Sequence, residues 1–162
     1  MDSLISVNKL TERIRTAVEE LSSVQAAYIY GGEFEQKHLD IFKGSVEYGT
    51  TCLVTAIAGD IELDKTLRTI NNAVNFSIFI IGINDINIET SIANSTDCLK
   101  TIDELSVLIM NNNFDHPQML KSKINGWQQV ENTIEENKRV NIYMLDFELT
   151  FKTNMNNNQY LI

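Results

Sequence analysis

The spacing of apolar positions predicts a helix near the start of the chain and another in its middle. Between Val7 and Leu21, apolar residues recur every three or four positions, which places them on one helical face. The same spacing returns over residues 90–110, and the run Asn111-Asn112-Asn113 ends it. Each helix therefore has one apolar stripe that can pack on a core.

Strand patterns occupy much of the remaining chain. We predict strands at residues 24–30, at 52–58 followed by a turn at Gly59-Asp60, at 69–83, weakly at 127–133, and at 139–151. The second half of 69–83 is apolar on both faces, so we expect it at the centre of a doubly covered sheet. In 139–151 the apolar positions change from even to odd numbers near Met144-Leu145, which predicts a β-bulge there.

The resulting order αβββαββ predicts an α+β fold with a mainly antiparallel sheet and both helices packed on one face. The βαβ alternation with glycine-rich turns that is typical of a doubly wound nucleotide-binding sheet does not occur. The 162 residues suit one domain. We assign residues 1–153 to it and residues 154–162 to a flexible C-terminal tail.

The polar segment over residues 33–51 has no clear period, and loops of this length inside compact domains are often functional. It also carries more apolar side chains than a solvated loop needs, so we expect it to project and contact a neighbour. The candidate residues for an interface with a partner or another subunit are Phe34, Phe42, Tyr48, Glu33 and Glu35.

The charge balance narrows the class of partner. The net charge of −9 comes from 22 acidic and 13 basic residues, which argues against a surface that grips nucleic acid or an anionic membrane. An acidic wall past which DNA slides without binding remains compatible with this charge. No apolar run approaches the length of a membrane span.

The sequence contains no motif with a known catalytic mechanism. It has no phosphate-binding glycine loop, no paired metal-binding histidines and no Cys-x-x-Cys. His38 and His116 fall in predicted loops, where we interpret them as surface imidazoles, and Cys52 and Cys98 as buried reduced thiols. We therefore predict no catalytic residue, no metal and no cofactor, and a protein that is not an enzyme.

Two further features have an ordinary structural interpretation. Asp146 and Glu148 share one face of the last strand, which suggests the wet side of a half-buried strand rather than a catalytic pair. Trp127 is either a partner anchor or a packed core residue, and the pattern does not decide between them.

The order of these segments resembles the tail terminator family of Mu-type contractile-tailed phages and related contractile injection particles. The resemblance spans nearly the whole chain and is carried by the helix at residues 4–21, the strand at 24–30 leading into Gly31-Gly32-Glu33, the strand at 52–59, the strand at 74–81 followed by a helix, and the terminal strand at 143–151. The family often has a proline opening the second strand, where this chain has Thr50-Thr51.

The resemblance implies a homo-oligomeric ring, usually a hexamer, that caps the tail tube, stops its polymerisation and docks sheath, head or neck proteins. It implies assembly in the cytoplasm of a producing bacterial cell, and then a place in a virion tail or injection particle. DNA could pass through such a ring without specific binding. The alternatives are a head–tail connector or stopper protein, and a monomeric small-ligand-binding α+β module.

Overall fold

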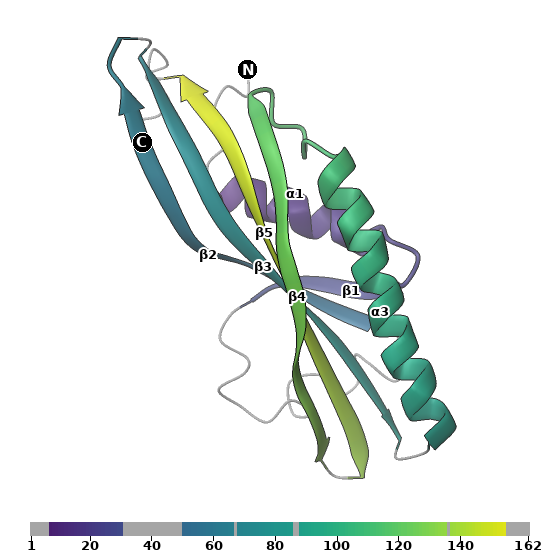
Figure 1. Ribbon diagram of the computed structural model, residues 1–162. Helices are drawn as coiled ribbons and strands as arrows, with labels where there is room; N and C mark the ends of the chain where they lie inside the picture. Colours follow the sequence, from purple (N-terminus) through teal and green to yellow (C-terminus); the bar gives the residue numbers. More distant parts are fainter. Residues whose placement is uncertain (1–6, 31–49, 67, 86–87, 136, 155–162) are drawn as a thin grey trace.

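The computed structural model describes residues 7–30, 50–66, 68–85, 88–135 and 137–154; within these, the side chains of residues 85, 88–96, 135 and 154 are not described. In these described ranges, two helices and five strands follow one another in the predicted order: α1 Val7–Glu19, β1 Val24–Ile29, β2 Thr50–Asp64, β3 Thr69–Asp85, α3 Ile88–Asn111, β4 Met119–Glu135 and β5 Lys138–Asn154. The strands form one sheet in the order β1-β2-β3-β5-β4, in which β1 and β2 are parallel and the other pairs are antiparallel (Figure 1).

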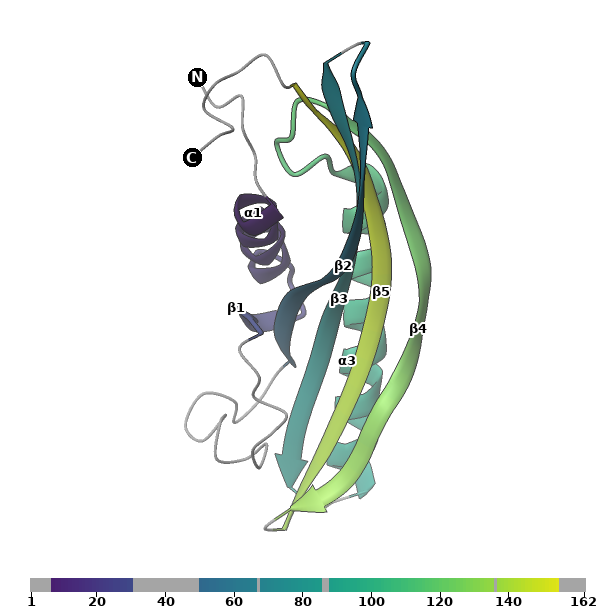
Figure 2. The same cartoon turned by 90° about the vertical axis from the view of Figure 1, so that its left-hand side faces the viewer.

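Both helices pack on the same face of this sheet, as the two apolar stripes predict. Leu10, Ile14 and Val18 of α1 are fully buried at four-residue spacing, and Ile102, Leu105 and Ile109 of α3 are buried at three- and four-residue spacing. These side chains join one core with the inward residues of the strands. Helix α1 packs against β1 and β2, whereas α3 runs along the sheet and packs against β3, β5 and β4 (Figures 1 and 2).

A second, smaller core lies on the opposite face of the sheet. Its buried members are Leu53, Ile81, Ile83, Val140 and Ile142, with Tyr30 and Phe79 packed against them. This confirms that the second half of the central strand β3 is covered on both sides.

The second core also corrects the predicted bulge near Met144-Leu145. Strand β5 pairs with β3 in unbroken register from Lys138 to Asn154. The apolar positions change from even to odd because one end of β5 also buries its far face, in the second core, while the rest faces the helices. The apolar residues of β5 therefore face the second core in one part of the strand and the helices in the other, although the strand itself is regular.

The bulges lie in β4 instead, which is much longer than the weak strand predicted at 127–133. Its 17 residues oppose only 14 of β5, because Leu120, Asn125 and Val130 are each an extra residue. Each bulge bends a strand and increases its twist. Strand β4 accordingly curves along its length (Figure 2).

Strand β2 also differs from its prediction, since it does not turn at Gly59-Asp60. It continues to Asp64 and pairs with β3 along its whole length, with one bulge at Ile57. Because β1 pairs only as far as Val54, residues 56–64 have β3 on one side and no strand on the other within the described sheet. We call this segment the free arm of β2.

The assignment of residues 1–153 to one domain and of residues 154–162 to a flexible tail stays a prediction. Strand β5 runs to Asn154, one residue into the predicted tail, and residues 155–162 lie outside the described part of the chain.

Candidate interaction site

The interface residues predicted from the sequence cannot be placed. Phe34, Phe42, Tyr48, Glu33 and Glu35 all belong to residues 31–49, which lie outside the described residues. Their assignment to a subunit or partner interface remains a prediction. The candidate surfaces that the structure does describe come from other segments.

The two cysteines are buried thiols, as predicted. Cys52 and Cys98 are free and have no exposed surface. Burial raises the pKa of both thiols well above the ordinary value, that of Cys98 to about 12, with Asp97 adding to the effect at Cys98. Thiols that stay protonated in an apolar core are poor nucleophiles. These two side chains therefore fill the core and do not form a reactive site.

His116 is not the surface imidazole that its loop position predicted, because it is buried against the ring of Phe151 with the ring centroids 4.7 Å apart. Its Nδ1 accepts a hydrogen bond of 3.0 Å from the backbone N–H of Gln118. Burial, together with the nearby charge of Arg13, lowers its pKa. His116 thus acts as a packed, neutral side chain. His38 lies outside the described residues.

No cluster of potential metal ligands occurs in the part of the chain that is described. Asp146, on the open face of β5, accepts a hydrogen bond from the hydroxyl of the buried Ser77. It is half-buried, as is Glu148. This arrangement agrees with the partly solvent-exposed strand face expected from the sequence.

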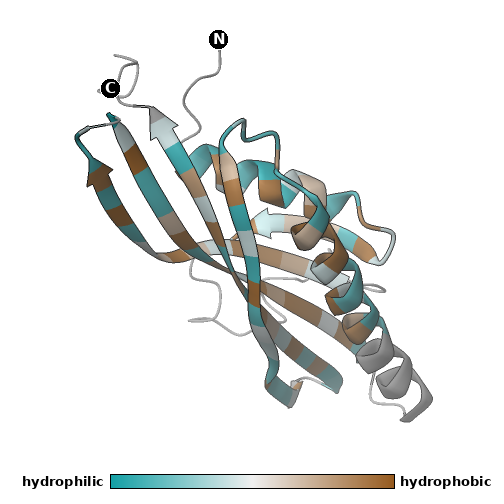
Figure 3. Ribbon diagram, turned by 45° about the horizontal axis from the view of Figure 1, so that its top comes forward, coloured by the Kyte–Doolittle hydropathy of each residue, from teal (hydrophilic) through white to brown (hydrophobic). Residues whose placement is uncertain are grey.

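The most exposed apolar side chains of the strands gather on the two strand segments at opposite sides of the sheet. On the free arm of β2 they are Ile57, Ile61 and Leu63, and on β4 they are Leu120, Trp127, Val130 and Ile134. Each of these side chains is half or more exposed, and Ile61 reaches 72%. Figure 3 shows apolar positions interspersed with polar ones along both segments. Such residues on open edges can pair with another strand.

Trp127 belongs to this exposed set, which favours partner anchor over core residue. Its side chain is 52% exposed, and its ring lies 6.0 Å from that of Tyr143 on the neighbouring strand. One side of the indole is therefore fixed by the sheet while the rest faces solvent. An aromatic ring held in this way loses little conformational entropy on binding.

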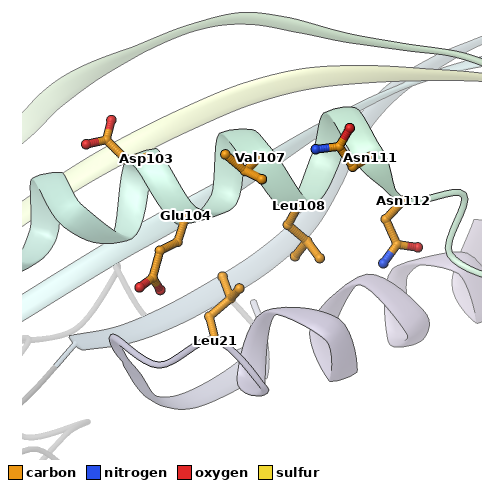
Figure 4. Close-up of a pocket in the computed structure, with 7 residues that line it drawn as sticks. All are labelled: Leu21, Asp103, Glu104, Val107, Leu108, Asn111 and Asn112. Atoms are coloured by element: carbon orange, nitrogen blue, oxygen red, sulfur yellow. The ribbon is translucent and has the colours of Figure 1, made fainter.

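A groove of about 530 Å³ between α3 and the end of α1 is a second candidate surface (Figure 4). It is lined by the apolar side chains of Leu21, Val107 and Leu108 and by four polar residues, Asp103, Glu104, Asn111 and Asn112. A concave apolar surface with a few polar groups at its edge is the usual form of a small-ligand site.

Glu104 connects the two sides of this groove. Its carboxylate accepts hydrogen bonds of 2.7 Å from the hydroxyl groups of Ser22 and Ser23, and one of 3.2 Å from the backbone N–H of Ser23. Burial acts to raise the pKa of Glu104, but these hydrogen bonds and the nearby Lys100 outweigh it and hold the pKa below its ordinary value. Glu104 therefore stays ionised and ties α3 to the turn that follows α1.

The sequence pattern missed both surfaces for identifiable reasons. A turn was predicted at Gly59-Asp60, so the free arm of β2 was not recognised as one strand. The alternation of Ile61, Glu62 and Leu63 is nevertheless a strand signal. The groove joins residues far apart in the chain, so no local pattern can reveal it.

Within the described residues, no helix is long and apolar enough to cross a membrane. When the chain is compared with models of protein families and with curated proteins, none matches.

Proposed function

We propose that this protein is a structural assembly protein that forms a closed ring of identical subunits and terminates a tail tube. The single observation that carries the proposal concerns the sheet of the described residues. Two segments at its opposite sides, the free arm of β2 and strand β4, have a strand neighbour on one side only and carry exposed apolar side chains. A subunit with unlike edges at its two sides can join its neighbours head to tail, and such contacts close into a ring when the rotation between neighbours divides a full turn.

The resemblance to tail terminators supports the more specific part of this proposal. The order αβββαββ, on which the resemblance rests, is also the order of elements in the fold. The function needs no catalytic residue, metal or cofactor. On this proposal the protein is not an enzyme, its partners are further copies of itself, the tube protein, and sheath, head or neck proteins, and it belongs to a virion tail or injection particle.

The experiment polymerises the cognate tube protein with and without this chain and measures tube lengths by negative-stain microscopy. A terminator shortens the length distribution and adds density to one end only. Tubes of unchanged length with bare ends would contradict the proposal. A connector or stopper instead binds tubes that are already complete and leaves their growth unaffected.

The groove between α1 and α3 favours a second candidate, a monomeric small-ligand-binding module. The two candidates differ in oligomeric state and in the surface they use. Sedimentation with and without tube ends distinguishes them, because the module stays monomeric under both conditions. A Val107→Glu variant separates the surfaces, since it places a charge in the groove and leaves both strand segments unchanged.

A further inference from the structure

We infer that the free arm of β2 in one copy pairs with the start of β4 in the next copy, with Asp60 placed beside Lys121. This inference rests on the ring in the proposed function and identifies the residues of its contact. It depends on the order and register of the strands, on the faces that their side chains occupy, and on the charges at the two edges.

The two segments lie at the same level of the sheet. Asp60 pairs with Ala73, Ala73 with Thr150, and Thr150 with Lys121, so one row of residues crosses from edge to edge. The next row on this face joins Ala58 to Lys123 through Asn75 and Glu148. Two copies placed side by side without a vertical shift therefore bring Asp60 of one copy opposite Lys121 of the other.

The strand directions fit this arrangement. Each of the pairs β2–β3, β3–β5 and β5–β4 is antiparallel, so β2 and β4 run in opposite directions. A neighbour in the same orientation then extends the sheet by one more antiparallel pair. Backbone N–H and C=O groups along the free arm and along β4 supply its hydrogen bonds.

The charges at the two edges are complementary and lie on the same face. Asp60 and Glu62 point to the face opposite the helices, because their partners Ala73 and Asn71 alternate with the helix-facing Val74. Lys121 and Lys123 point to that face too, opposite Thr150 and Glu148. All four are exposed. Lys123 already has Glu148 beside it, so Lys121 is the better partner for an acidic neighbour.

The apolar side chains agree with the same alignment. With Asp60 opposite Lys121 in an antiparallel pair, Ile61 of one copy lies next to Leu120 of the other. These side chains are 72% and 55% exposed in the single copy. A lysine on an edge strand discourages indiscriminate pairing. The acidic free arm of a neighbouring copy attracts that lysine, so the edge pairs selectively with this partner.

The test uses two single charge reversals, alone and mixed. Asp60→Lys leaves lysines on both edges, and Lys121→Glu leaves acids on both. Each variant alone should self-associate at least about tenfold more weakly than the natural chain. Mixed in equal amounts, the two should associate again, because the reversed arm of the first variant meets the reversed β4 edge of the second, and the unchanged arm and edge meet each other. The mixed ring alternates, so it needs an even number of subunits.

Disulfide cross-linking detects the contact even if subunits without the tube associate too weakly to be seen by sedimentation. A chain carrying both Asp60→Cys and Lys121→Cys should give a ladder of disulfide-linked species beyond the dimer. Either substitution alone should give at most dimers. The natural Cys52 and Cys98 are buried and do not contribute. Circular dichroism and thermal unfolding verify that each variant is folded.

Two results would overturn the inference if no disulfide ladder forms either. One is self-association that the charge reversals leave unchanged. The other is a mixture of the two variants that associates no more strongly than each variant alone. These results are independent of the tube assay. Restored association without capped tubes would retain the contact and reject the terminator. Capped tubes that are indifferent to both reversals would retain the terminator and reject this contact.

Discussion

At the scale of single residues, the loop after α3 shows how tertiary contacts hold an unfavourable backbone. Phe114 and Asp115 have φ values of 52° and 56°, a region in which a bulky residue is an outlier. The side chains of Asn112 and Asn113 accept hydrogen bonds from the two backbone N–H groups, and Arg13 of α1 donates to both carbonyl oxygens. The side chains of Phe114 and His116, which belong to this loop, are buried.

The burial of His116 predicts a pH effect on stability. Its pKa in the folded protein lies below the ordinary value of 6.5, owing to burial and to Arg13. As the pH falls below 6.5, the unfolded chain binds a proton there before the folded protein does, so the free energy of unfolding decreases. We expect His116→Gln to flatten this decrease between about pH 7 and about pH 5, measured by urea unfolding. Parallel pH profiles for the variant and the natural protein would contradict the expectation.

At the scale of elements, β4 illustrates how one strand carries several bulges. Its extra residues Leu120, Asn125 and Val130 are five positions apart, and Gly126 follows the second of them with a φ of 147°. An L side chain rarely adopts that conformation, so glycine is required at this bulge.

A matched pair of glycine substitutions tests this requirement. At Gly126 an added Cβ would meet no atom within 4 Å, so any cost of Gly126→Ala is backbone strain alone. We expect it to destabilise the protein by about 1 kcal/mol or more. Gly59→Ala is the control, because that strand position has no positive φ and its nearest contact would be an ordinary 3.5 Å. It should leave the free energy of unfolding within about 1 kcal/mol of the natural value, on the stabilising side. Equal losses at both positions in chemical denaturation would show that the φ of Gly126 does not matter.

At the scale of the whole molecule, the sheet has a protected centre and unprotected margins. Strands β3 and β5 each have a neighbour on both sides and supply both cores, including the stacked rings of Phe76 and Phe147 at 5.3 Å. The free arm of β2 and the outer edge of β4 have only one neighbour within the described sheet.

Hydrogen exchange should be slow at the centre of the sheet and fast at its margins, and assembly should slow it at the margins. In dilute protein, we expect amides of β5 to exchange only by global unfolding, and outward amides of the free arm and β4 to exchange quickly. Raising the protein concentration should slow exchange at both margins together and leave β5 unchanged. Slowing at only one margin would point to a contact other than head-to-tail pairing.

The sequence by itself determined the class of fold, the order αβββαββ, the strand β3 and the buried cysteines. Each follows from a local period of apolar residues, or from an apolar neighbourhood, which short-range geometry fixes. Only the tertiary structure decided that β2 continues through Gly59-Asp60, that β5 is regular with two cores of opposite phase, and that the bulges lie in β4. It also decided which segments of the described sheet have a strand neighbour on only one side: β5 lies inside the sheet, while β4 and the free arm of β2 lie at its margins. The physical reason is that edge and centre are defined by pairing between residues far apart in the chain, and a strand's own pattern records which faces are buried, not which neighbours lie beside it.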